Sequence, residues 1–170
     1  MNLHEFQVEA LREIYDAELQ AAEALPRMAG AASSLDLRKA FEDHAAVTKR
    51  QVQRLEDLFR RMGAEPERKE SKAMRGLAAE ADEFIRRDGM DPEFRDAALN
   101  TAEQKIEHFE AAAYNAAAEM AEATGQSHAA RVLRQILREE EGMSRKLAQL
   151  SLRWLRRRVR EEQRAARGAA

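Results

Sequence analysis

The chain has 170 residues, enough for one domain, and carries a formal net charge of −2, with 35% charged and only 5% aromatic residues. It contains no cysteine, which excludes disulfides, thiol catalysis and thiolate metal sites, and its small net charge provides no general attraction to nucleic acid or anionic membranes. Alanine, leucine, glutamate and arginine dominate, while glycine and proline are scarce, so the composition favours long helices over a sheet.

Hydrophobic periodicity and turn residues predict five helices, over residues 3–31, about 35–62, 68–87, 92–124, and from 127 past Trp154. Pro26 should kink the first helix or interrupt its hydrogen-bond ladder, since proline has no N–H. Ser33 and Ser34 can cap the second helix, which Gly63 is placed to end. Asp91 precedes a proline at the first position of the fourth helix, a common way for a helix to begin.

The links between the long helices are short, which favours antiparallel neighbours. The third helix is the shortest, and we expect it to form the crossover. The predicted architecture is therefore an all-α four-helix bundle with one additional short crossover helix, in a single domain over residues 1–165. The first residues, MNLHEFQVEAL, do not resemble a signal peptide, and no apolar run approaches the roughly 18 residues that would span a bilayer. We expect a cytoplasmic protein.

From about residue 153 the last helix becomes rich in arginine, in the segment LRWLRRRVREEQRAARGAA. The arginines are distributed around the helix, and Glu161 and Glu162 interrupt them, so we expect a solvated helix end whose positive charge complements the helix dipole. Contact with nucleic acid or an acidic partner is the less favoured alternative.

Each of the four long helices carries polar residues on the stripe that should be buried. These are Glu18 in the first helix, His44 and Gln51 in the second, Glu110 in the fourth with Glu107 a step further out, and Glu140 in the fifth. They fall near the middle of their helices, so antiparallel packing should bring them to the same depth. Isolated buried carboxylates are costly, and convergent ones are usually reconciled by a cation.

Oxygen and imidazole ligands of this kind suit iron and manganese, and di-metal bundles use glutamates and histidines in this way. A hydrogen-bonded network of histidine, glutamate and glutamine without metal would use the same residues, and no complete Glu-x-x-His motif is present. His108 lies off the predicted core line and is expected to pack against the crossover helix, a dimer partner or solvent. Tyr15 and Tyr114 flank the stripes, either as core residues or as redox-active neighbours of a metal.

Four segments of the chain resemble successive helices of the YciF-type ferritin-like family. They are LREIYDAELQAAEALPRMAGAASS, LRKAFEDHAAVTKRQVQRLE, RDAALNTAEQKIEHFEAAAYNAAAE and LREEEGMSRKLAQL. The resemblance covers about residues 5–151, in the same order. It implies a bacterial ferritin-like bundle, a homodimer, an association with stress and a di-metal carboxylate site.

By position, the resemblance implies that five residues contribute to the metal site: Glu18, His44, Glu107, Glu110 and Glu140. Val47 replaces a glutamate that usually follows the histidine, and Ser144 replaces an aspartate of the last helix. Both positions face inward by the helical count. We therefore expect an incomplete site that holds zero to two iron or manganese ions.

The sequence thus predicts a stress-associated protein with a partly degenerate non-haem iron or manganese site that acts on peroxide or O₂. The alternative is a non-enzymatic structural or interaction protein that has lost metal binding. We expect a homodimer that binds neither membranes nor nucleic acid.

Overall fold

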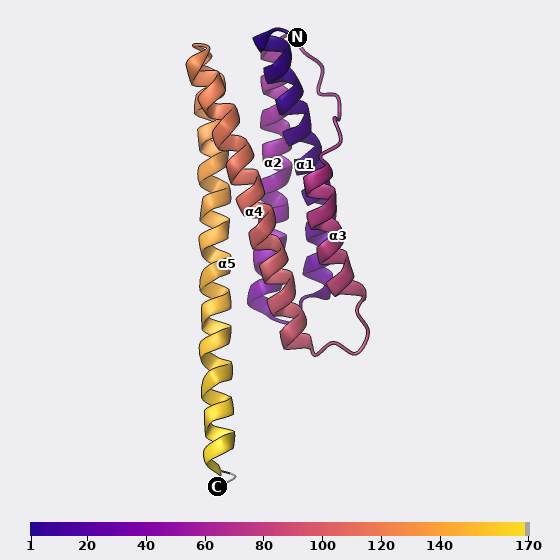
Figure 1. The fold of residues 1–170 in the computed structure, drawn as a ribbon, viewed down its shortest axis with the longest axis vertical. Helices are drawn as coiled ribbons and strands as arrows, with labels where there is room; N and C mark the ends of the chain where they lie inside the picture. The colour runs from indigo at the N-terminus through magenta and orange to yellow at the C-terminus, as the bar shows by residue number, and fades with distance from the viewer. Residues whose placement is uncertain (169–170) are drawn as a thin grey trace.

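The computed structural model describes residues 1–168, and these form five helices with no strand among them (Figure 1). The helices are α1 (Leu3–Ala31), α2 (Leu35–Arg61), α3 (Lys72–Arg86), α4 (Pro92–Ala123) and α5 (Ser127–Gly168). The predicted all-α class is confirmed. The predicted third helix began too early, because residues 64–71 form a non-helical connection. The last two residues of the predicted arginine-rich end lie outside the described residues.

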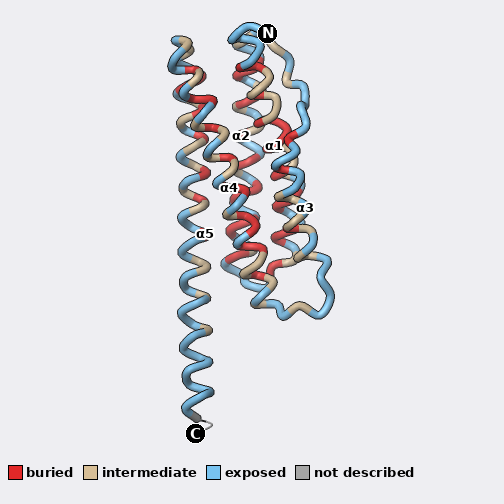
Figure 2. The backbone as a smooth tube through the Cα atoms, in the orientation of Figure 1, coloured by how far each residue is buried: buried red, intermediate tan, exposed pale blue. Residues whose placement is uncertain are grey.

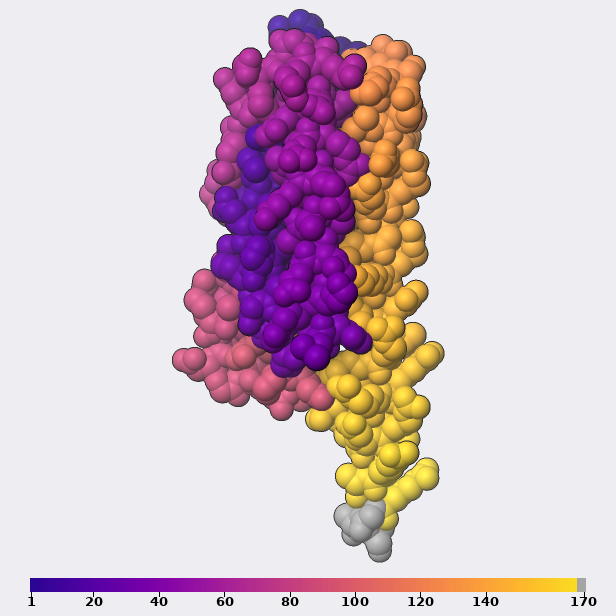
Figure 3. All heavy atoms as spheres, turned by 180° about the vertical axis from the view of Figure 1, so that it is seen from behind, coloured from indigo at the N-terminus to yellow at the C-terminus, as the bar shows by residue number. Residues whose placement is uncertain are grey.

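The four long helices form a bundle, in which α1 packs mainly with α2 and α4 mainly with α5. The crossover helix α3 packs against α1 and α4 on the outside, as predicted (Figure 1). Helix α5 runs on well beyond the ends of its neighbours, and from residue 159 to residue 167 every side chain is exposed (Figures 2 and 3). No helix in the described part of the chain is both long and apolar enough to cross a membrane.

Pro26 does not end α1, which continues to Ala31. Its neighbours Leu25 and Met28 are fully buried, so packing holds the helix together past the missing N–H. Positive φ angles at Gly63, Gly89 and Gly125 turn the chain after α2, α3 and α4, a backbone conformation that glycine adopts without steric cost.

Two buried aspartates fasten the connections to the bundle. Asp96 of α4 accepts hydrogen bonds from the backbone N–H groups of Ser33 and Ser34 and from the Ser33 hydroxyl, and so pins the α1–α2 turn. Asp16 of α1 accepts from the Ser71 N–H at 2.8 Å and from Arg68 at 2.7 Å, and so holds the segment before α3. Both connections set the relative height of the helices that carry the polar residues.

The apolar core has two large clusters, one toward each end of the bundle, and a smaller third cluster where α3 packs against α1 and α4. One cluster includes Leu11, Ile14, Leu55, Phe59, Leu133 and Ile136. The other includes Leu25, Met28, Leu37, Phe41, Leu99 and Leu147. On α1, α4 and α5 the central buried polar residues fall between the two large clusters in sequence. On α2, His44 lies at the border of one cluster and Gln51 lies between the two, so a polar layer crosses an otherwise apolar bundle.

Candidate metal centre

Four side chains from three helices meet in the polar layer. His44 of α2, Glu107 and Glu110 of α4, and Glu140 of α5 each place a potential ligand atom within 4.8 Å of the others, and all four are buried. Helix α5 packs against both α4 and α2, and the side chains from all three helices point into the bundle, which is why residues so far apart in sequence converge. The structure therefore brings together four of the five residues predicted for the site.

The histidine is surrounded by carboxylates. His44 Nε2 lies 2.9 Å from Glu107 Oε1, 3.6 Å from Glu140 Oε2 and 3.9 Å from a third carboxylate, Glu103 Oε1. Glu107 was expected a step further out from the core than Glu110, and this is wrong, because its side chain is 0% exposed and lies beside His44.

Glu103 was missed by the sequence analysis. It is buried one helical turn before Glu107 and seven residues before Glu110, so it lies on the same face of α4. The neighbouring apolar residues Ile106 and Phe109 pack beside α3, and Phe109 is only half-buried. Because α3 covers that side of α4, the helix is apolar on two sides, and its true bundle face could not be identified from periodicity alone.

The fifth predicted residue, Glu18 of α1, is buried at the edge of the four-residue group. The hydroxyl of Tyr114 donates a close hydrogen bond to Glu18 Oε1. Burial, followed by the charge of Glu140, raises the pKa of Glu18 to about 8. Tyr114 is thus the tyrosine that faces the centre, whereas Tyr15 bonds at 3.1 Å to Glu56.

Hydrogen bonds to α5 account for the polar residue Gln51 on the buried stripe of α2. Its amide donates to Glu140 Oε1, in a close contact, and to Glu139 Oε2 at 3.2 Å. Glu139 also pairs with Arg54, nearer the surface. A polar chain therefore runs from the surface of the α2–α5 seam to the central carboxylate Glu140.

The two positions that depart from the family pattern lie at the border of the bundle. Val47 and Ser144 are each half-buried, so the expectation that they face the interior is met only in part. Ser144 Oγ lies 3.4 Å from His108 Nδ1. His108 is exposed, in keeping with its expected place off the core line.

The charged state of the carboxylates is strongly disfavoured in the protein alone. Burial, followed by the charges of Glu18 and Glu140, raises the pKa of Glu110 well above its ordinary value. Burial, followed by the charge of Glu107, raises the pKa of Glu140 in the same way. Burial also raises the pKa of Glu103. A divalent cation among these groups would restore their ionised forms, because opposite charge lowers a carboxyl pKa.

The carboxylate oxygens fit a metal ion by a further criterion. Buried oxygens without any hydrogen-bond donor occur on four glutamates of this layer: Glu103, Glu107, Glu110 and Glu140. Buried polar atoms are nearly always partnered, so these acceptors could either hold a cation or, as neutral carboxyls, bond to one another. The donors are oxygens and one imidazole, which suit iron and manganese.

A family model described as a domain of unknown function, DUF892, matches residues 2–160. Protein YciF from Escherichia coli (strain K12) is 36% identical over 146 residues, which cover 85% of this chain and 87% of YciF. The crystal structure of the E. coli stress protein YciF superposes with a TM-score of 0.87 and 34% identity, over 92% of this chain and 98% of that chain.

Two further solved structures are similar. YcfI from Rhodopseudomonas palustris, described as a candidate structural protein, has a TM-score of 0.83 and 33% identity, over 87% of this chain and 94% of its own. A ferritin-like diiron-carboxylate protein from Bacillus anthracis str. Ames has a TM-score of 0.69 over 89% of this chain and 99% of its own. At 14% identity, the latter likeness concerns the fold alone, which is ferritin-like as expected.

Proposed function

This chain belongs to the DUF892 family, and we propose that it is a ferritin-like metalloprotein whose buried centre holds non-haem iron or manganese. The observation that carries the proposal is the convergence of five buried glutamates and one histidine, with unpartnered carboxylate oxygens on four of the glutamates. A purely structural core would gain nothing from such a group, since each unpaired buried carboxyl lowers stability.

The residues that could hold the ion form a central group and two outer carboxylates. His44, Glu107, Glu110 and Glu140 form the group that is close enough to surround one ion. Glu103 and Glu18 extend it with two further carboxylates, one next to His44 and one held by Tyr114. Because Glu103 supplies a carboxylate that the sequence analysis omitted, the expectation of an incomplete site based on Val47 and Ser144 loses much of its basis.

Bound iron or manganese would supply one-electron chemistry toward peroxide or O₂. The surroundings suit this use, because two apolar clusters enclose the polar layer and all six side chains are shielded from solvent. Gln51 and Tyr114 orient Glu140 and Glu18 through hydrogen bonds. We propose a stress-associated role in the cytoplasm, supported by the similarity to a protein described as a stress protein.

The alternative is a structural or interaction protein without metal. It is favoured by the lack of acids at Val47 and Ser144 and by the similarity to YcfI. In that case the buried carboxyls would remain neutral and hydrogen-bonded to each other.

The two functions differ in how the protein affects iron oxidation. Fe(II) would be mixed with the metal-free protein, and its oxidation by hydrogen peroxide and by O₂ would be followed by absorbance. We expect the parent to accelerate oxidation over Fe(II) in buffer, the Glu110→Gln variant to lose this effect, and the Glu141→Gln variant to retain it, since Glu141 is exposed on α5. Oxidation at the rate of free Fe(II) would refute the proposed activity in favour of the alternative.

A further inference from the structure

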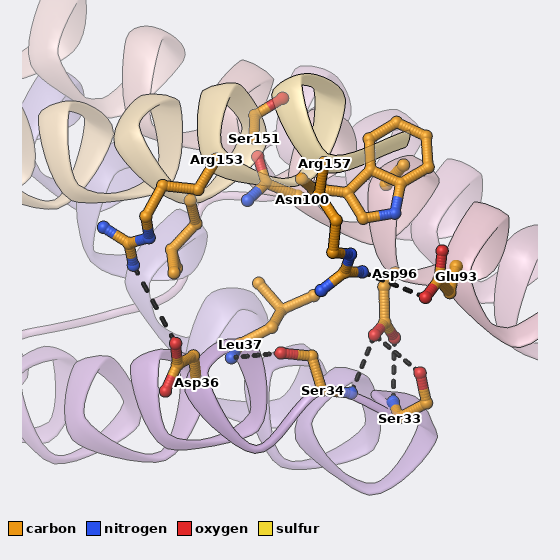
Figure 4. Close-up of a pocket in the computed structure, with 13 residues that line it drawn as sticks. Ser33, Ser34, Asp36, Leu37, Glu93, Asp96, Asn100, Ser151, Arg153 and Arg157 are labelled. Atoms are coloured by element: carbon orange, nitrogen blue, oxygen red, sulfur yellow. Dashed lines mark hydrogen bonds and ion pairs between the residues drawn. The ribbon is translucent and has the colours of Figure 1, made fainter. Parts of the chain in front are cut away.

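A cavity of about 470 Å³ lies between α5, the α1–α2 turn and the first turns of α4 (Figure 4). Its volume falls in the range of small-molecule sites, roughly 300–1,000 Å³. Arg153 in its wall lies about 20 Å along α5 from Glu140, at the rise of a helix. The arginines of this wall are therefore remote from the metal centre, whereas Asn100, which also lines the cavity, lies one helical turn before Glu103.

The α5 wall combines an apolar surface with positive charge. Leu150 and Trp154 line the cavity, and Arg153 and Arg157 extend from α5 toward the α1–α2 turn (Figure 4). Trp154 is fixed by an edge-to-face contact with Phe94, with ring centroids 5.8 Å apart. The indole Nε1 of Trp154 is buried and has no hydrogen-bond partner. This wall therefore offers donors and a flat apolar face at the same place.

The opposite wall has little acceptor capacity left, although it contains acids. Asp96 already accepts from two backbone N–H groups and the Ser33 hydroxyl, at 2.7–2.8 Å. Glu93 is held by Arg157 at 2.9 Å and by Arg158 at 3.7 Å. Asp96 and one oxygen of Glu93 are therefore engaged, while Glu93 Oε2 faces Arg158 without a well-formed hydrogen bond.

Arg153 is the positively charged group that is most easily recruited. Its one ion pair, with Asp36, is 3.9 Å long, and both side chains are largely exposed. Such an exposed pair contributes little and can be given up for a better acceptor.

We propose that this cavity binds a small organic carboxylate with an apolar or aromatic body. The carboxylate pairs with Arg153, and the body lies against Leu37, Leu150 and Trp154. The ligand size is set by the cavity volume, and its sign of charge by the weakly paired Arg153 on α5. The proposal does not rest on the metal centre.

The chain has a single tryptophan, so the fluorescence of Trp154 reports directly on this cavity. Phenylacetate would be titrated into the full-length protein in the presence of a chelator, with phenylacetamide as the uncharged control. We expect a saturable change with phenylacetate and a Kd on the order of 1 mM, as suits a small ligand. Saturation-transfer NMR on phenylacetate would measure the same binding independently of fluorescence.

Two arginine variants locate the binding. Arg153→Gln should weaken phenylacetate binding by about tenfold, because a charge-assisted hydrogen bond is lost. Arg156→Gln is the matched control on the same helix, since Arg156 lies away from this cavity with Leu155 and Val159. Thermal melts should show that both variants fold.

Three outcomes would overturn the proposal. They are no saturable signal by either method up to about 10 mM phenylacetate, equal binding of phenylacetamide, or binding that Arg153→Gln leaves unchanged. Because the titration contains no metal, none of these outcomes bears on the iron or manganese proposal.

Discussion

His44 Nε2 and Glu107 Oε1 lie 2.9 Å apart, yet both oxygens of Glu107 lack a hydrogen-bond donor in proper geometry. The two side chains come from α2 and α4 and are completely enclosed. A histidine and a carboxylate that approach this closely without a well-formed hydrogen bond are placed to share a third partner. We propose that this partner is a metal ion, and the predictions below separate that view from a metal-free core.

Tyr114→Phe should destabilise the metal-free protein, because it removes the hydroxyl that donates to Glu18 Oε1 while keeping the aromatic ring. The expected loss in the free energy of unfolding is about 1–3 kcal/mol, that of a buried acceptor left unpaired. Urea unfolding measures it. Tyr15→Phe is the control, since its hydroxyl bonds to the less buried Glu56, and it should have a smaller effect. Equal losses of stability in the two variants would contradict the prediction that the Tyr114 hydroxyl stabilises Glu18.

The stability of the metal-free protein should fall as the pH rises from about 5.5 to 8. The pKa of Glu18 is 4.5 ordinarily and about 8 in the fold, so between these values the folded protein binds a proton that the unfolded chain releases. The contribution of Glu18 to the free energy of unfolding is complete below pH 4.5. It is lost as the pH rises through about 8, by up to about 1.4 kcal/mol per pH unit. Glu103, Glu107, Glu110 and Glu140 shift in the same direction.

Thermal melts in a chelating buffer test this dependence. Glu18→Gln should flatten part of it, because glutamine does not titrate. Added metal should reverse the trend, since ions bind deprotonated carboxylates and their affinity increases with pH. A melting temperature that rises between pH 5.5 and 8 without metal would show that these carboxyls are not held neutral.

Restoring the two absent acids should change metal binding little. Val47 and Ser144 are half-buried, so Val47→Glu and Ser144→Asp would place their charges near solvent rather than in the centre. Glu103→Gln, by contrast, removes a carboxylate 3.9 Å from His44 and should lower the amount of bound ion. Elemental analysis of the double variant and of Glu103→Gln, after loading with metal, shows which of these positions affects the amount of bound ion. A double variant that binds more metal than the parent would mean that Val47 and Ser144 limit the site.

The protein should be a homodimer in solution, as the family resemblance implies. Large apolar side chains remain exposed on the projecting part of α5, where Leu152, Leu155 and Val159 recur at helical spacing. Light scattering should return twice the mass of one chain at micromolar concentration. A mass equal to one chain would remove this prediction.

The helices and the polar layer could be predicted because their signals are local or periodic. Glu18, His44 and Glu140 lie in the middle of apolar stripes, and all three are buried in the fold. Glu103 could not be found in this way, because α3 covers a second side of α4 and hides which face meets the bundle. The cavity beside Trp154 depends on how far α5 stands from the α1–α2 turn, which no sequence pattern specifies.

The central test is metal binding itself. Untagged protein would be loaded anaerobically with Fe(II) or Mn(II), dialysed and analysed for metal, together with Glu107→Gln/Glu140→Gln and the exposed control Glu141→Gln. We expect the parent and the control to retain about one ion per chain or more, and to gain roughly 2.7 kcal/mol of stability at a hundredfold excess over Kd. The double variant should retain less than about a tenth as much, because two ligands of the central group are lost. A parent that retains no more metal than the double variant would contradict the proposal that this layer is a metal centre.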